Sequence, residues 1–142
     1  MDFGVAEPIQ RALSRLTDEA SYGYEPPMLS SALGQAFAAH MQAQFGWQAS
    51  PERVVPVADL VQALFTLVSA FTERGQGVVL QTPIYPPFQN SVRETGRRIV
   101  EHRLVDDGTR FRVDGATLPA ALYQDAPLLL LCNPHNPTGR ML

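Results

Sequence analysis

The chain contains no lysine: all 11 basic residues among its 142 are arginines. A reaction that needs a lysine side chain therefore cannot take place on these residues alone. Its single cysteine, Cys132, excludes an internal disulfide. That cysteine stands inside an apolar run, where a small buried thiol is the ordinary interpretation.

Long apolar runs and clusters of positive charge are also missing. No run approaches the roughly 20 residues that span a bilayer, and the start, MDFGVAEP, lacks the basic-then-apolar pattern of a secretory signal. The net charge of −3 gives no basic patch for nucleic acid or an anionic membrane. We therefore expect a cytoplasmic protein that binds neither nucleic acid nor membrane.

The composition that remains, 45% hydrophobic and 18% charged, is that of a globular domain with a buried core. Two amphipathic helices are expected in an entry segment, residues 1–50. The first follows Pro8, and the second covers residues 28–45, where large apolar residues recur every four positions.

Residues 51–142 alternate between extended and helical patterns, which predicts an α/β domain with a mostly parallel sheet and flanking helices. His102 is expected at the surface of its strand, and the last strand is expected to be fully buried. The expected elements are an extended segment at 53–57, helices at 58–75, 86–96 and 114–124, and strands at 77–81, 97–105 and 127–133.

The three most unusual stretches, VPVADL, TPIYPPF and NPHNPTGR, fall where such a sheet binds its ligands, beyond the carboxyl ends of the strands. In the last, Pro134 and Pro137 stiffen the backbone, so the amide of Asn133 or Asn136 could be held toward a ligand. The alternative is that both asparagines only shape turns.

The other two stretches offer a ring and a helix start. Tyr85, between Pro83 and Pro86, could lie flat on a planar ligand, or be an ordinary core or surface tyrosine. The helix that begins near Ala58 has open amides for an anion. Asp59 would repel a phosphate unless it points away, and a simple capped helix start is the alternative.

These motifs resemble the class I/II aminotransferase superfamily, the fold-type-I enzymes that use pyridoxal 5′-phosphate (PLP). NPHNPTGR carries the resemblance most specifically. The order of AEPI, YGY, VVPV, TPIYPPF and LCNPHNPTGR is similar to the bacterial cystathionine β-lyase branch. The resemblance implies that residues 51–142 are the first part of a PLP-binding large domain, and that the chain is the amino-terminal part of a longer enzyme.

The resemblance also implies roles for individual residues. Asn136 would hydrogen-bond the phenolic oxygen of PLP, and Tyr85 would stack on its ring. The turn Val57, Ala58 and Asp59 would bind the phosphate through backbone amides. Tyr24 would reach the phosphate of a neighbouring subunit, which implies a homodimer with shared active sites.

The implied reaction is β-elimination from cystathionine or a cysteine conjugate, giving thiol, pyruvate and ammonia. It needs a lysine to form a Schiff base with PLP, so this chain alone should be inactive. Two alternatives stay open, part of an aminotransferase with the same scaffold and a non-enzymatic or decayed remnant.

Overall fold

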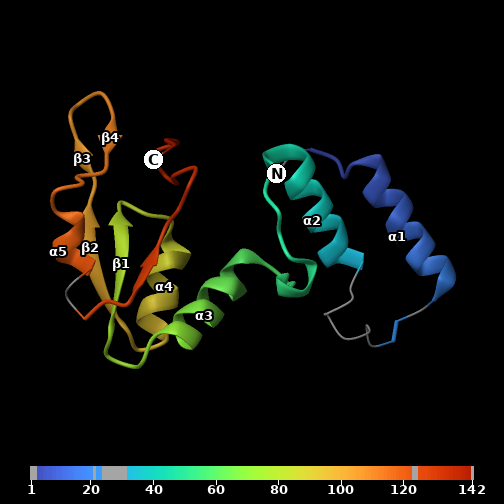
Figure 1. Cartoon of the computed structure of the whole chain (residues 1–142), viewed down its shortest axis with the longest axis horizontal. Coiled ribbons are helices and arrows are strands. Elements are labelled where there is room, and N and C mark those ends of the chain that lie inside the picture. The colour runs from blue at the N-terminus through green and yellow to red at the C-terminus, as the bar shows by residue number, and fades with distance from the viewer. Residues whose placement is uncertain (1–2, 21, 24–31, 123–124, 142) are drawn as a thin grey trace. The chain divides into compact units, whose positions relative to one another are not determined.

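The computed structural model describes residues 3–20, 22–23, 32–122 and 125–141. It has two compact units, residues 1–56 and 57–142, whose elements Figure 1 shows. The expected division into domains after residue 50 stays a prediction.

The first unit contains helices α1 (Glu7–Glu19) and α2 (Ala32–Phe45) and a 3-10 helix, Pro51–Arg53. Pro8 lies in the first turn of α1, where a missing N–H costs nothing, and Ala20 ends the helix in the left-handed region with φ of 48°. Both helices expected from periodicity are present. Residues 28–31 of the second lie outside the described part of the chain.

The second unit is built on a parallel sheet of order β2-β1-β5. Its central strand β1 (Gly77–Thr82) is buried at every residue, as a strand covered on both faces must be. It pairs in parallel with β2 (Arg98–Arg103) on one side and with β5 (Leu128–Leu130) on the other. The predicted α/β fold with a mostly parallel sheet is therefore confirmed.

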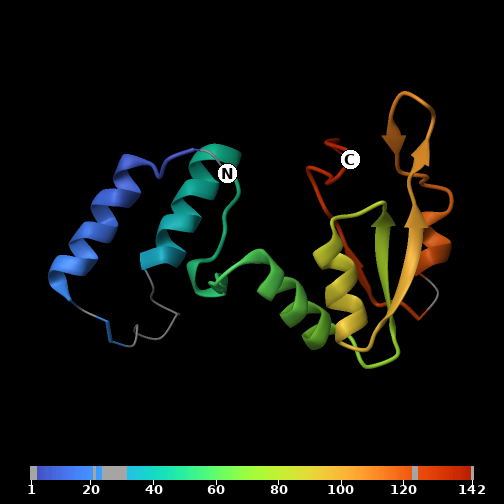
Figure 2. The same ribbon diagram turned by 180° about the vertical axis from the view of Figure 1, so that it is seen from behind.

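Helices cover both faces of this sheet (Figure 2). On one face α3 (Leu60–Phe71) and α4 (Pro86–Glu94) enclose the larger core, and on the other α5 (Leu118–Leu122) lies beside a smaller one. The larger core consists of Leu64, Val68, Val78, Leu80, Ile84, Phe88, Val92 and Leu130. The smaller consists of Val79, Val100 and Ala126.

Helix α3 ends at Phe71, four residues before the glycine that was expected to stop it. Thr72 takes extended backbone angles, and its hydroxyl donates to the carbonyl of Val68. The Arg97 guanidinium donates to the Thr72 carbonyl oxygen at 2.6 Å. Arg97, which is distant from α3 in the sequence, thus provides a charged hydrogen-bond donor for a carbonyl oxygen at the end of the helix.

The strand expected over 97–105 is in fact two elements. After β2 the chain enters a hairpin of β3 (Val105–Asp106) and β4 (Phe111–Arg112), which was not expected. The turn between these strands contains Asp107 and Gly108, with φ of 83° at the glycine. An Asp-Gly pair is a strong hairpin signal, so the sequence held this information.

We expect the Asp107 carboxyl to titrate far below its usual pKa of 3.8. The hydroxyl of Thr109 and the backbone amides of Thr109 and Arg110 donate to the carboxylate and lower its pKa to about 2. Because the pKa is lower in the folded hairpin, this stabilisation is complete above pH 3.8 and is lost as the pH falls toward 2. Carboxyl NMR should show this titration, and Thr109→Ala should move it back toward 3.8; an unchanged value in the variant would contradict this assignment.

The last strand is shorter and less buried than expected. The prediction was a fully buried strand over 127–133, but β5 covers Leu128–Leu130, and only Leu130 is buried. The reason is its place in the sheet, because β5 pairs with β1 alone and forms one edge. The helix expected at 114–124 is likewise confined to α5, with residues 123–124 outside the described part.

Candidate functional site

The candidate site lies at the edge of the sheet where β1 and β5 end. Figure 1 shows the tip of β1 and the segment after β5 at the same edge, beside the β3–β4 hairpin. The stretches TPIYPPF and NPHNPTGR both begin there, as the alternation of elements predicted. The peptide bonds before Pro83, Pro134 and Pro137 are cis.

Tyr85 is positioned by the core residue before it and the helix after it. Ile84 is 6% exposed and packs in the larger core, whereas Tyr85 is 39% exposed. The Tyr85 carbonyl oxygen accepts the amide of Phe88 at 3.0 Å, and Pro86 begins α4. Tyr85 is therefore held at a helix start and stays partly exposed.

Asn136 begins a tight turn, residues 136–139, closed by a bridge between His135 and Arg140. The His135 amide donates to the Arg140 carbonyl oxygen at 2.6 Å, and the Gly139 amide to the His135 carbonyl oxygen at 2.7 Å. Gly139 has φ of 67°, which glycine tolerates best. The Asn136 side chain is exposed and makes no hydrogen bond within the described part of the chain, so its amide is available to a ligand.

A buried histidine connects this turn to β1. The His135 side chain is 1% exposed, with Nδ1 at 2.9 Å from the Thr138 hydroxyl and Nε2 at 3.4 Å from the Gln81 carbonyl oxygen. Since Gln81 is in β1 and Tyr85 follows that strand by three residues, the structure brings the Asn136 turn and the Tyr85 loop to one place. No pattern in the sequence had indicated a role for His135.

The third predicted stretch begins α3 and forms a reciprocal cap. Asp59 is the N-cap, its carboxylate accepting the Gln62 amide at 2.8 Å, and the Gln62 side-chain oxygen accepts the Ala58 amide at 2.9 Å. Val57, Ala58 and Asp59 are all exposed. The carboxylate is thus engaged with its own helix, and the amides of Leu60 and Val61 remain the open donors of the first turn.

This helix start and Tyr85 belong to neighbouring helices, because α3 packs against α4. Both helices run opposite to β1, so each begins toward the edge where β1 ends (Figure 1). Tyr24, the remaining predicted site residue, lies outside the described residues.

Charged groups also occupy this edge. The Thr82 hydroxyl donates to Glu101 Oε1 at 2.9 Å, and Arg103 forms an ion pair with the same carboxylate at 3.0 Å. The pKa of Glu101 is held below its usual value, chiefly by the hydrogen bond from the Arg103 guanidinium and next by the one from the Thr82 hydroxyl. The end of β1 is therefore joined to that of β2 by side chains as well as by the backbone.

A hollow of about 530 Å³ lies between the β3–β4 hairpin and the Asn136 turn. Arg110 and Arg140 both line it. Arg110 comes from the β3–β4 hairpin, which was not predicted from the sequence. Its full lining is Asp106, Gly108, Thr109, Arg110, Phe111, Pro137, Thr138 and Arg140.

The expectation that His102 lies at the surface is wrong. Its side chain is 3% exposed, on the α5 side of the sheet, and its Nε2 lies 3.0 Å from the Asp114 carbonyl oxygen and 3.1 Å from the Thr117 hydroxyl. The segment that leads into α5 covers this position, which periodicity within the strand could not reveal. Gln81 is its register partner in the sheet. Among the residues that the structure describes, neither Gln81 Oε1 nor His102 Nδ1 has a hydrogen-bond partner, and both atoms are buried.

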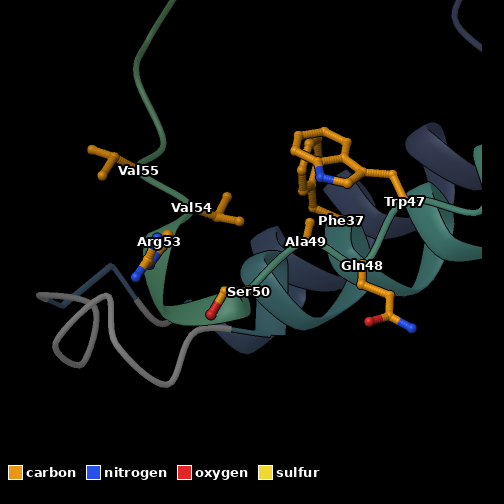
Figure 3. Close-up of a pocket in the computed structure, with 8 residues that line it drawn as sticks. All are labelled: Phe37, Trp47, Gln48, Ala49, Ser50, Arg53, Val54 and Val55. Carbon is orange, nitrogen blue, oxygen red and sulfur yellow. The ribbon is translucent and has the colours of Figure 1, made fainter.

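A separate hollow of about 500 Å³ belongs to the first unit, and none of the predicted site residues that the structure describes lines it (Figure 3). Phe37 and Trp47 stand edge to face in it, with ring centroids 6.0 Å apart. Its other lining residues are Gln48, Ala49, Ser50, Arg53, Val54 and Val55.

Within the described ranges, no helix is long and apolar enough to cross a bilayer. The same residues contain no group of three or more His, Cys, Asp or Glu side chains that could hold a metal ion.

The motifs and the fold agree with comparisons to known proteins. The family model described as aminotransferase class I and II matches residues 2–142. The chain belongs to this family. The resemblance inferred from NPHNPTGR and TPIYPPF is thus confirmed at the level of the family.

The similar proteins include both carbon–sulfur lyases and aminotransferases. The chain is 37% identical to cystathionine β-lyase PatB of Bacillus subtilis over 141 residues, 99% of this chain and 36% of the relative. The PLP-containing structure of cystalysin from Treponema denticola is 28% identical with a TM-score of 0.90, over 100% of this chain and 36% of that one. The structure of N-succinyldiaminopimelate aminotransferase from Mycobacterium tuberculosis is 30% identical with a TM-score of 0.88. The match covers 99% of this chain and 37% of that one.

The chain thus spans about 36% of the length of these relatives. The fold of residues 57–142 is that of the corresponding part of a fold-type-I enzyme, a parallel sheet with helices on both faces.

Proposed function

We propose that this chain is the amino-terminal third of a PLP-dependent carbon–sulfur β-lyase and carries half of its cofactor site. The observation that supports this most is the placement of Asn136 and Tyr85 on two loops that His135 holds at one edge of the sheet. The similarity to cystathionine β-lyase and cystalysin supports the choice of lyase.

The donor set at this edge fits PLP. The exposed Asn136 amide can donate to the phenolic oxygen, and the partly exposed Tyr85 offers an aromatic ring for the pyridine. The amides of Leu60 and Val61 at the start of α3 suit the phosphate. The predicted contact through Ala58 requires the Gln62 side chain to release that amide, because Gln62 occupies it here.

When bound, PLP withdraws electrons from the α-carbon of an amino acid, which makes loss of a group from the β-carbon possible. The described residues bind and orient rather than react. Asn136 would hold the phenolic oxygen of PLP, and Tyr85 would lie against its ring. The lysine that removes the α-proton, the acidic partner of the pyridine nitrogen and the arginine for the substrate carboxylate are proposed to follow residue 142.

The proposed substrates are cystathionine or related cysteine conjugates, cleaved to thiol, pyruvate and ammonia. The proposed assembly is a cytoplasmic homodimer, in which Tyr24 reaches the phosphate of the neighbouring subunit.

We propose that this chain is part of a longer protein. That full-length protein should release thiol and pyruvate from cystathionine in equal amounts, without an added keto acid. A thiol reagent and lactate dehydrogenase measure the two products. In the control, the protein is dialysed against a carbonyl reagent that removes PLP and is then assayed without added PLP, and neither thiol nor pyruvate should form. Absence of thiol release from the PLP-loaded protein would contradict the lyase proposal.

The alternative is an aminotransferase with the same scaffold, which the 30% identity to the N-succinyldiaminopimelate enzyme favours. Such an enzyme would consume the amino acid only when a keto acid is present, and would leave the carbon–sulfur bond intact. The same assay, repeated with 2-oxoglutarate, therefore separates the two activities.

A further inference from the structure

Among described residues 131–141, His135 alone has a buried side chain. It is 1% exposed, while Asn136 beside it is exposed. A polar ring in such a place needs partners for both nitrogens. The Thr138 hydroxyl lies 2.9 Å from Nδ1, and the Gln81 carbonyl oxygen lies 3.4 Å from Nε2, at the long end for a hydrogen bond.

The partners indicate which nitrogen carries the proton. A carbonyl oxygen only accepts, so Nε2 must donate to Gln81, and Nδ1 of the neutral ring then accepts from the Thr138 hydroxyl. The other tautomer would point the Nε2 lone pair at the lone pairs of the Gln81 carbonyl oxygen and leave both buried atoms without a donor. The buried ring therefore has the hydrogen on Nε2.

The main chain of His135 is fixed as well. Its amide and carbonyl make the two short hydrogen bonds, 2.6 and 2.7 Å, that close the turn beginning at Asn136. Gln81, the partner of the ring, is 2% exposed in the central strand. The residue directly before Asn136 is thus held to the buried central strand of the sheet.

We propose that His135 is a positioning residue, which acts through Asn136 and fixes the Asn136 amide relative to β1 and Tyr85. The inference rests on the proposed function, because it assumes that the Asn136 amide binds the phenolic oxygen of PLP. His135 itself does not touch the cofactor. Without its ring bonds, the turn keeps its local closure but loses its hydrogen bond to β1.

The test uses the full-length protein and two readouts besides activity, the dissociation constant of PLP and the absorption maximum of bound PLP. His135→Leu should weaken PLP binding about tenfold, the loss expected for one to two hydrogen bonds, and should shift the absorption maximum. His135→Gln places an amide near the position of Nε2 and should restore most of the affinity.

A double-mutant cycle separates positioning from general structural damage. In an Asn136→Ala background, His135→Leu should cause no further loss of PLP affinity, since the residue through which it acts is gone. His40→Leu removes an exposed histidine from α2 in the other unit and should leave both readouts unchanged.

Two results would overturn the inference: a tenfold loss that persists in the Asn136→Ala background, or PLP affinity and absorption that His135→Leu leaves unchanged. If His135→Leu fails to fold, Thr138→Val, which removes the partner of Nδ1, gives the same test when its PLP affinity is compared with and without Asn136→Ala. The inference assumes the proposed PLP site and holds for a lyase or an aminotransferase alike. Failure of that site differs visibly, because the wild-type protein itself would then not bind PLP.

Discussion

Replacing Asn136 by aspartate in the full-length protein should weaken PLP binding roughly tenfold to a hundredfold, the range for a hydrogen bond to a charged group. Aspartate has the same size and the same preference for turns as asparagine, but it has no N–H to donate to the phenolic oxygen and adds a negative charge. Fluorescence or absorption titration with PLP measures the change, and Asn136→Ala should lose a similar amount.

The aspartate variant distinguishes ligand binding from turn formation, the alternative interpretation of this residue. If Asn136 only shaped the turn, Asn136→Asp would bind PLP as the wild type does, and that result would contradict the assigned role. Asn90→Ala makes the matched change on the exposed surface of α4 and should leave PLP affinity intact.

Leu80→Ala should lower the free energy of unfolding of the 142-residue chain by about 3 kcal/mol, the middle of the range for such cavities. Leu80 is 0% exposed in the central strand and packs with Leu64, Val68 and Phe88 in the larger core. The neighbouring side chains relax only partly into the space that the leucine leaves. The cost of the resulting cavity therefore adds to the lost free energy of burying the leucine side chain. Urea unfolding followed by circular dichroism measures this loss.

The matched control is Leu131→Ala, directly after β5, where the side chain is 56% exposed. Its effect should stay within about 0.5 kcal/mol, as for other surface substitutions. Equal losses in both variants would show that β1 does not form the centre of the core.

The alternation of elements was predictable because it depends on local patterns. The apolar residues Val78, Val79 and Leu80 within 77–81 indicate a strand buried on both faces, and the glycines and prolines around it mark its ends. Parallel pairing then follows from the helix between consecutive strands. These local signals also placed Tyr85 and Asn136 at one edge, where the structure has them.

Features that depend on distant partners were missed. Arg97 ends α3 by reaching Thr72 across 25 positions of the sequence, and the segment before α5 buries His102. His135 meets Gln81 over a separation of 54 residues. No periodicity within one element reports such contacts, so the surface assignment of His102 was wrong and His135 was overlooked.

The start of α3 lies between these cases. The sequence showed the conflict between Asp59 and a phosphate, and left a capped helix start as the alternative. In the structure Asp59 caps its own helix and Gln62 caps Ala58 in return. An acid followed three residues later by Gln is a known capping pattern, so this pair could have been predicted. The contact of Val57, Ala58 and Asp59 with phosphate stays a prediction.

The central claim is that the edge formed by Asn136, Tyr85 and the start of α3 is half of a PLP site. A crystal structure of the full-length protein with PLP tests it most directly. We expect the Asn136 side-chain nitrogen about 2.9 Å from the phenolic oxygen, with the Tyr85 ring parallel to the pyridine. PLP bound elsewhere, or an Asn136 amide turned away from PLP, would contradict this claim.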